Sequence, residues 1–271
     1  MGFVAAIINN KGGVGKTTVV CNLAHALSLQ GKRVLVVDLD SQCNATALLL
    51  PKENNPPHSL YELLEQDGLG RKLQDYCYPT HIERVFCLPN VPETASLEPR
   101  LIVGAPDSFF RLRRHLRDQA RARFDVTIMD TPPNLGTFVL CALIAADFAL
   151  VPVKAGSAFS VEGLLKAVRL VKEVQEQSNR DLRFLRLLIN QVDKRTLISR
   201  TLAAQISGAF REDQVFRTSI PANTAFERAE AAGTTLLGYH PGAPGAAAFR
   251  ELAQEFLEIT GEVGRSRRKA T

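Results

Sequence analysis

Seven residues near the N-terminus have the types and spacing needed to hold a chain of phosphate groups. Gly12, Gly13, Val14, Gly15, Lys16, Thr17 and Thr18 follow a short apolar run and precede a helical pattern, which is the context that a phosphate-binding loop requires. Glycines let backbone N–H groups turn inward around phosphate oxygens, and the N-terminus of the next helix adds partial positive charge. We therefore interpret the segment as a nucleotide-binding P-loop and not as a simple turn.

Individual side chains of this loop predict specific contacts. Lys16 would neutralise the β- and γ-phosphates, the hydroxyl of Thr17 would ligate Mg²⁺, and Thr18 would contact the α-phosphate. Lys11 precedes the first glycine, where an ordinary P-loop needs no lysine. A second cation there would be able to reach the phosphates of a neighbouring subunit, as an arginine finger does. The alternative for Lys11 is a solvated surface lysine.

Three aspartates follow predicted strands. Asp38 and Asp40 end one apolar run, and Asp130 ends another. The carboxyl ends of strands line the ligand crevice of a doubly wound sheet, so two carboxylates after one strand would hold the Mg²⁺ shell and position a water. Asp130 is placed as a Walker-B aspartate and would bind Mg²⁺ directly or through water. For Asp38 and Asp40 the alternative is a helix cap or a loop residue.

The elements that must position these residues alternate along the chain. Short apolar runs predict buried strands at residues 4–8, 34–37, 126–129, 148–151 and 184–189. Helical patterns lie at residues 17–30, 60–64, 107–123, 134–146, 160–177, 198–210 and 245–259. This alternation predicts an α/β fold, a doubly wound and mainly parallel sheet with helices on both faces. The Pro- and Asn-rich stretch 51–106 is interpreted as an irregular insertion on the same domain.

Bulk composition sets the class of protein. Of the 271 residues, 45% are hydrophobic and 23% are charged, as in ordinary globular proteins. We predict one domain over residues 1–262 and a basic, disordered tail at 263–271. No membrane span or leader is apparent, so a cytoplasmic protein is expected. The five scattered cysteines are expected to be free thiols, and the net charge of +5 weakly indicates a polyanionic partner.

The motifs, in this order, resemble those of the ParA/MinD family of deviant Walker-A ATPases, and within it the short, Soj-like ParA type. Residues 11–18 resemble the family's loop with its extra lysine. Residues 37–46 are similar to its second motif, residues 130–133 to its third, and residues 220–233 to its C-terminal nucleotide-base segment. The resemblance covers nearly the whole chain, from residue 1 to about 260.

The resemblance implies a partitioning ATPase that uses ATP and Mg²⁺. Such proteins form an ATP-bound sandwich dimer, bind double-stranded DNA without sequence preference and position a plasmid, a chromosome origin or a protein cargo over the nucleoid. A ParB-like or cargo-adaptor protein stimulates hydrolysis and releases them. By resemblance, Lys11 would reach the other subunit's ATP, Asp40 would orient the attacking water and Asp38 would support the Mg²⁺ site. Asn190 and the backbone of Pro221 would contact adenine.

The sequence departs from the family pattern at three positions. Ser41 replaces the usual Pro and Cys43 the usual Gly beside Asp40, so the hydrolysis rate is expected to differ. Ala222 stands where an Arg commonly follows Pro221, which removes one expected contact to DNA or nucleotide. No helix-turn-helix segment precedes the loop, so operator-specific binding is not expected.

Basic residues of the C-terminal third are candidates for DNA contacts, because non-specific binding needs only several phosphate contacts. The alternative for each is a solvated surface cation. The candidates are Arg195, Arg200, Arg217, Arg228 and Arg250, with Arg211 and the cations of residues 265–269 beyond them. The basic helix predicted at 107–123 offers a second DNA surface, or a surface for the cargo partner.

Three other functions stay open. A MinD-like, membrane-associated positioning ATPase would end in a helix with opposed basic and apolar faces, whereas the last helix here carries Glu251, Glu255 and Glu258. No membrane partner is therefore expected. An iron–sulfur carrier would need cysteines that bridge a dimer, and the nearest candidate, Cys141, lies in an apolar helical stretch. A metabolic ligase of the same fold class is the third alternative.

Overall fold

A seven-stranded sheet forms the centre of the computed structural model, which describes residues 2–51, 56–65, 70–154, 161–192, 206 and 208–270. The strand order is β3-β4-β2-β5-β1-β6-β7. All neighbours pair in parallel except β3 and β4. The strands are β1 (Phe3–Ile7), β2 (Val34–Asp38), β3 (Tyr78–Pro79), β4 (Val85–Leu88), β5 (Val126–Asp130), β6 (Phe148–Lys154) and β7 (Arg183–Asn190). The predicted doubly wound α/β fold is confirmed.

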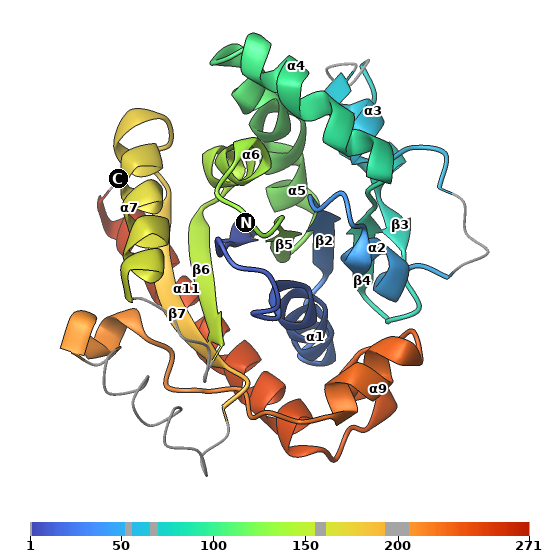
Figure 1. Ribbon diagram of the computed structural model, residues 1–271, viewed down its shortest axis with the longest axis vertical. Coiled ribbons are helices and arrows are strands. Elements are labelled where there is room, and N and C mark those ends of the chain that lie inside the picture. Colours follow the sequence, from blue (N-terminus) through green and yellow to red (C-terminus); the bar gives the residue numbers. More distant parts are fainter. Residues whose placement is uncertain are drawn as a thin grey trace.

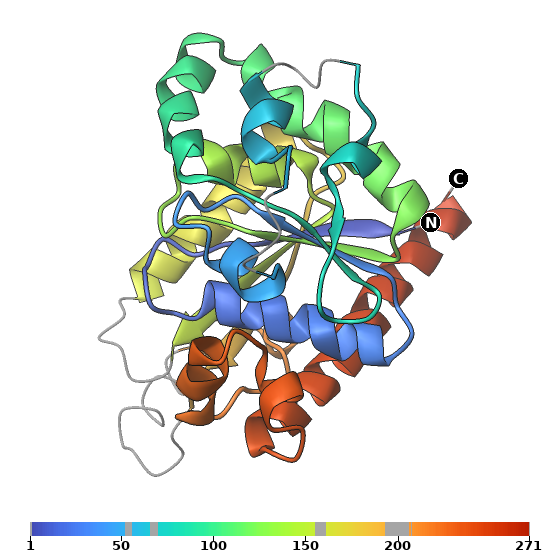
Figure 2. The ribbon, with the colours of Figure 1, turned by 90° about the vertical axis from the view of Figure 1, so that its right-hand side faces the viewer.

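Helices cover both faces of the sheet (Figures 1 and 2). They are α1 (Lys16–Leu29), α2 (Asn44–Leu49), α3 (Leu60–Glu65), α4 (Leu97–Val103), α5 (Asp118–Arg123), α6 (Thr137–Ala145), α7 (Val161–Gln177), α9 (Ala225–Ala231), α10 (Leu236–Tyr239) and α11 (Pro244–Ala270). Short 3₁₀ turns are η1 (Leu73–Tyr76), η2 (Pro92–Ser96), η3 (Asp107–Phe110) and η5 (Glu212–Gln214), and η4 (Arg113–Arg117) is a π-helical turn.

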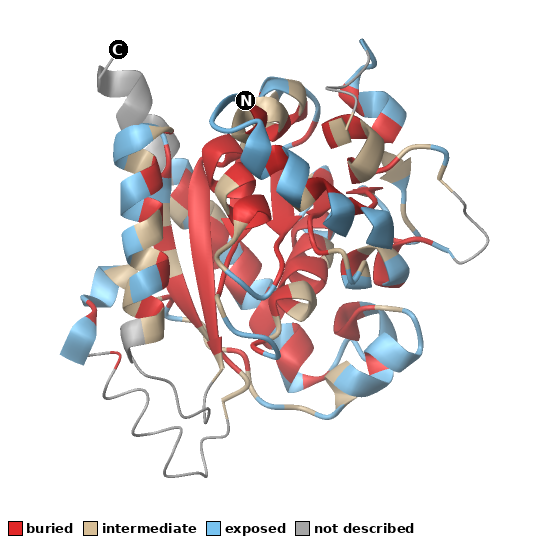
Figure 3. Ribbon diagram, turned by 45° about the horizontal axis from the view of Figure 1, so that its top comes forward, coloured by how far each residue is buried: buried red, intermediate tan, exposed pale blue. Residues whose placement is uncertain are grey.

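Two hydrophobic cores explain why the central strands are apolar throughout. Side chains alternate across a strand, so Val4 and Ala6 of β1 pack into one core, with α3 to α7. Ala5 and Ile7 pack into the other, with α1, α2, α10 and α11. Figure 3 shows the resulting band of buried residues through the middle of the molecule. Within the described ranges, no helix is both long enough and apolar enough to cross a membrane.

The stretch 51–106 is more regular than predicted. It contributes β4 to the central sheet, where Val34–Val37 of β2 pairs with Val85–Leu88 in parallel register, and it also contains β3 and α4. Sequence reasoning missed β4 because the strand has only four residues and adjoins Pro89, so it gives little periodic signal. The interpretation of this stretch as largely irregular was therefore wrong.

Other boundaries differ at the C-terminal half. The helix α11 continues to Ala270, beyond the predicted end at residue 259 and across most of the predicted tail. Most of the helix predicted at 198–210 lies outside the described residues.

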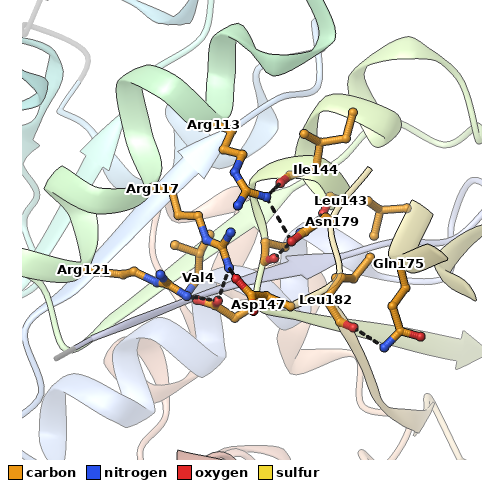
Figure 4. A network of polar contacts seen from close by, with 12 residues as sticks. Val4, Arg113, Arg117, Arg121, Leu143, Ile144, Asp147, Gln175, Asn179 and Leu182 are labelled. Carbon is orange, nitrogen blue, oxygen red and sulfur yellow. Dashed lines mark hydrogen bonds and ion pairs between the residues drawn. The ribbon is translucent and has the colours of Figure 1, made fainter. Parts of the chain in front are cut away.

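The basic segment 107–123 is not one regular helix, and only part of it faces the protein interior. Arg113 and Arg117 of η4 and Arg121 of α5 point toward Asp147 and Asn179 (Figure 4). Arg117 is buried and bonds the carboxylates of Asp147 (2.7 Å) and Asp181 (3.1 Å). Arg121 also bonds Asp147, and Arg113 donates to the carbonyl of Ile144 and to Asn179.

Asp147 explains this inward orientation. Its carboxylate also accepts the backbone N–H of Val4 at 2.9 Å, so it ties β1 to the arginines. A buried carboxylate requires such partners, and they hold the pKa of Asp147 below its ordinary value against the opposing effect of burial. The prediction that this segment offers a DNA or cargo surface was therefore wrong for the buried Arg117, whereas Arg113 and Arg121 are partly exposed and bonded within the chain.

Candidate nucleotide-binding site

The P-loop lies at the carboxyl ends of three adjacent strands. It joins β1 to α1, and β5 lies between β1 and β2. Residue pairing sets Ile7 beside Asp130 and Asp130 beside Asp38. This register brings the loop and both strand-end aspartates to one place, as the position of a ligand crevice in a doubly wound sheet requires.

Two glycines and one asparagine fix the shape of the loop. Gly13 and Gly15 have φ angles of 71° and 82°, a left-handed conformation that glycine adopts without strain. A Cβ at Gly15 would lie 2.5 Å from Nδ2 of Asn190. That same amide donates to the carbonyl of Val14 at 2.8 Å. Asn190, at the end of β7, therefore holds the loop by its backbone.

The ammonium of Lys16 is folded into the loop. It is buried, and it lies 3.4 Å from the carbonyl oxygen of Asn9 and 3.3 Å from that of Lys11. Burial lowers its pKa, while the carboxylates of Asp130 and Asp40 act in the opposite direction. These two hydrogen bonds are long, so a phosphate oxygen could replace the carbonyls at little cost.

Thr17 and Asp130 provide oxygen atoms of the kind that Mg²⁺ prefers. The Thr17 hydroxyl donates to one carboxylate oxygen of Asp130 at 2.6 Å. The other, Oδ1, is buried and has no protein partner, which an incoming cation would satisfy. Burial, and secondarily the charge of Asp38, raise the pKa of Asp130 to about 8.

The oxygen donors are few. Among the described residues, no group of three or more His, Cys, Asp or Glu side chains is arranged to hold a metal by itself. This fits Mg²⁺, which commonly takes one or two protein ligands together with phosphate oxygens and water.

Asp38 is already fully engaged. One oxygen accepts the N–H of Asp40 at 3.1 Å, and the other accepts the N–H and hydroxyl of Thr46 at 2.9 and 2.7 Å. Burial raises its pKa to about 6, although these hydrogen bonds oppose the effect. Asp38 therefore positions Asp40 and the first turn of α2, a contact that the sequence did not predict.

Asp40 faces the ligand space. Its carboxylate accepts the N–H of Gln42 at 3.0 Å, which leaves the group at the edge of a cavity of about 690 Å³. The P-loop, α2 and the end of α9 line this cavity. Lys16 lines the same cavity, and the negative charge of Asp40 acts to raise the pKa of its ammonium group.

A second, smaller cavity of about 230 Å³ lies beside the first. Asn190, Asn223 and Phe226 line it. The backbone of Pro221 pairs with that of Val192, but Pro221 lines a separate cavity with Ala248 and not this one. Asn190 thus lines the smaller cavity and Pro221 a neighbouring one, and their contact with adenine stays a prediction.

Sequence reasoning assigned no role to Glu230, although it noted the motif around it. The Thr18 hydroxyl donates to Glu230 of α9 at 2.6 Å. Spacing could not reveal the contact, because 212 residues separate the partners. The only available signal was a charged residue inside a segment already assigned to nucleotide binding.

The other predicted residues that the structure describes do not line these two cavities. Lys11 is exposed on the loop. Arg228 and Arg250 are also exposed, and the guanidinium of Arg250 donates to the carbonyl of Pro241. Arg217 pairs with Glu258 at 3.1 Å and Glu255 at 3.6 Å. Arg195 and Arg200 lie outside the described residues.

Two further features bear on the membrane-associated and iron–sulfur alternatives. Glu255 is buried and pairs with Arg186 at 3.1 Å, so it is not part of an exposed acidic face of α11. All five cysteines are free, as predicted, and Cys141 is buried in α6.

Comparisons with known proteins agree with this geometry. A family described as an AAA domain matches residues 2–184. The chromosome-partitioning ATPase Soj of Thermus thermophilus is 38% identical over 93% of this chain and 94% of its own. A solved structure described as cobyrinic acid a,c-diamide synthase of Mycobacterium smegmatis, with a bound ATP analogue and magnesium, is 32% identical with a TM-score of 0.79, covering 95% of both chains. The cell division ATPase MinD of Pyrococcus furiosus shares the fold, with a TM-score of 0.74, 24% identity and coverage of 96% of this chain and 100% of its own.

Proposed function

The chain belongs to the ParA/MinD family of P-loop ATPases, and we propose that it is a partitioning ATPase that positions DNA or a protein cargo. In the proposed cycle, ATP binding produces a dimer that binds DNA without sequence preference at the nucleoid. A ParB-like or cargo-adaptor protein then stimulates hydrolysis and releases it. The observation that carries the proposal is that Lys16, Thr17 and Asp40 line one cavity, with the buried Asp130 hydrogen-bonded to Thr17 behind it.

The chain's own residues suggest how ATP would be bound. Lys16 would leave the carbonyls of Asn9 and Lys11 for the β- and γ-phosphates, and the N–H groups of the glycine loop would surround them. Thr17 and Asp130 would hold Mg²⁺. Asp38 would support the site by holding Asp40 and Thr46 through hydrogen bonds. Mg²⁺, when bound, would neutralise charge that develops on the phosphates.

Hydrolysis would depend on Asp40. Its carboxylate lies at the cavity edge and is held by the N–H of Gln42, so it can accept a hydrogen bond from a water and orient it. The exposed Lys11 would reach the phosphates of the second subunit and make catalysis depend on the dimer.

DNA binding is proposed to use exposed cations on the C-terminal part of the chain. Arg228 and Arg250 are better placed than Arg217, because Glu255 and Glu258 already neutralise the latter. A dimer would present two such surfaces to one duplex and gain effective concentration.

A gel shift with two unrelated duplexes tests the proposal. With ATP and Mg²⁺ we expect both duplexes to shift equally, and with ADP or in Lys16→Ala we expect the shift to be lost. Each phosphate contact should contribute roughly −0.9 to the slope of log affinity against log salt. Arg228→Ala should reduce the magnitude of that slope by about one, and Arg217→Ala, the control, should change it less.

Two competing functions predict different results. Binding of the ATP form to anionic vesicles without a DNA shift would favour the MinD-like, membrane-associated alternative. The Mycobacterium smegmatis structure makes a ligase the second candidate. Phosphate release that depends on cobyrinic acid and not on DNA would support that ligase and contradict partitioning.

A further inference from the structure

Thr18 and Glu230 separate the two cavities of the site. Among the described residues, these two alone line both the larger cavity beside the P-loop and the smaller one beside Asn190. Their side chains form a 2.6 Å hydrogen bond, with the Thr18 hydroxyl donating to the Glu230 carboxylate. A ligand that extends through both cavities must therefore pass this pair.

The sugar is the part of a nucleotide that would lie at this boundary. The larger cavity contains Lys16 and Thr17 and suits the phosphates, while the smaller contains Asn190 and Phe226 and suits a base. The ribose connects the two, one bond beyond the α-phosphate that Thr18 is expected to contact. Carboxylates are well-known acceptors for ribose hydroxyls in nucleotide sites.

We propose that Glu230 binds the ribose hydroxyls of ATP and selects ribonucleotides over deoxyribonucleotides; this rests on the proposed nucleotide-binding function. In the free protein the Thr18 hydroxyl donates to Glu230. On binding, that hydroxyl donates to the α-phosphate, and the Glu230 carboxylate accepts from the sugar. One hydrogen bond within the protein is thus replaced by two to the ligand, and the carboxylate gains a new donor when it loses the old one.

Electrostatics favours this exchange. A carboxylate that stayed on Thr18 would face the negative α-phosphate, and like charges at short range repel. Glu230 is exposed on α9, so its side chain can turn toward the sugar without leaving a buried charge unpaired.

The test compares affinities for ATP, 2′-deoxy-ATP and 3′-deoxy-ATP, each with Mg²⁺, by isothermal titration calorimetry. We expect the wild-type protein to prefer ATP over at least one analogue by about tenfold, within the range for a charged hydrogen bond. Glu230→Ala should reduce this ratio to about one, and Glu230→Gln, which keeps an acceptor oxygen, should give an intermediate ratio.

Glu227→Gln is the matched control. Glu227 lies on the same helix and lines the smaller cavity but not the larger one, so this variant should keep the wild-type ratio. Equal binding of all three nucleotides by the wild type, or full discrimination by a folded Glu230→Ala, would overturn the proposal and leave the ATPase function intact. Failure of the wild type to bind any nucleotide would overturn both.

Discussion

At the scale of single residues, the site concentrates buried charges that the chain's own contacts only partly neutralise. Burial raises the pKa values of Asp130 and Asp38 and lowers that of Lys16. Oδ1 of Asp130 has no protein partner. Strongly shifted groups of this kind gather at functional sites because a ligand supplies the missing partner. Asp130 thus keeps one carboxylate oxygen available for a cation beside Thr17. Both carboxylate oxygens of Asp38, in contrast, already accept hydrogen bonds within the chain.

Asp40→Ala separates binding from hydrolysis. The carboxylate orients water and does not hold the triphosphate, so we expect ATP affinity within a few-fold of wild type. We expect phosphate release to fall by roughly 10²–10⁴-fold, the usual effect of removing such a group. Size-exclusion chromatography with ATP should show a persistent dimer. Turnover at the wild-type rate would remove Asp40 from this role.

At the scale of elements, polar contacts fix the helices and turns that frame the sheet. The arginines of η4 and α5 bond Asp147 at the start of β6. On the other side, His25 of α1 contacts the hydroxyl of Thr235, the residue that caps α10, at 2.6 Å. These contacts lie away from the nucleotide cavities, so their loss should affect stability more than chemistry.

Arg117→Ala tests the buried network. It leaves Asp147 with fewer donors in a buried setting, and breaking a buried ion pair typically costs about 3 kcal/mol or more. Urea unfolding should show this loss with little change in ATP affinity for the folded fraction. Arg114, in the same segment, pairs with Asp107 in an exposed position. Arg114→Ala should therefore cost less than about 1 kcal/mol, and an equal cost for both variants would contradict the prediction.

His25 gives a pH-dependent stability. Burial lowers its pKa from 6.5 to about 4, so the folded chain holds the neutral form between these values. The unfolded chain binds a proton there, and the stabilising contribution of His25 is present above pH 6.5 and is lost as the pH falls toward 4. The melting-temperature difference between wild type and His25→Asn should shrink over this range. A constant difference would exclude this explanation.

At the scale of the whole molecule, the single chain leaves part of the proposed site open to a partner. The larger cavity is bounded by the P-loop, α2 and α9, and Lys11 is exposed beside it. Exposure suits a residue whose partner phosphate lies on the second subunit of the proposed dimer. Charge supports the same assignment, because a net +5 favours polyanion binding when two copies combine.

Lys11→Ala should affect the dimer more than the monomer. We expect nucleotide affinity at low protein concentration to change less than about threefold, because Lys16 supplies the charge within the chain. We expect the ATP-dependent dimer to be lost at micromolar concentration in sedimentation experiments. A variant that still dimerises with ATP would show that Lys11 acts within its own chain.

The sequence by itself determined the fold class and predicted which residues would bind phosphate. Both depend on local patterns: apolar runs that must be buried, and a glycine loop between a strand and a helix. The P-loop follows β1, and the aspartates stand at or just after the ends of β2 and β5, so parallel pairing brings them to one edge of the sheet. The same local reasoning failed for β4, whose four residues carry too little periodicity.

Only the tertiary structure decided which charges are used internally and which face a ligand. The arginines of 107–123 look like a surface patch in sequence, but Asp147 binds two of them, Arg117 and Arg121, because a buried carboxylate needs donors. Asp38 accepts a hydrogen bond from Thr46. Glu230 accepts one from Thr18, although 212 residues separate the two in the sequence. Such contacts depend on the packing of elements far apart in the chain, and no local pattern encodes them.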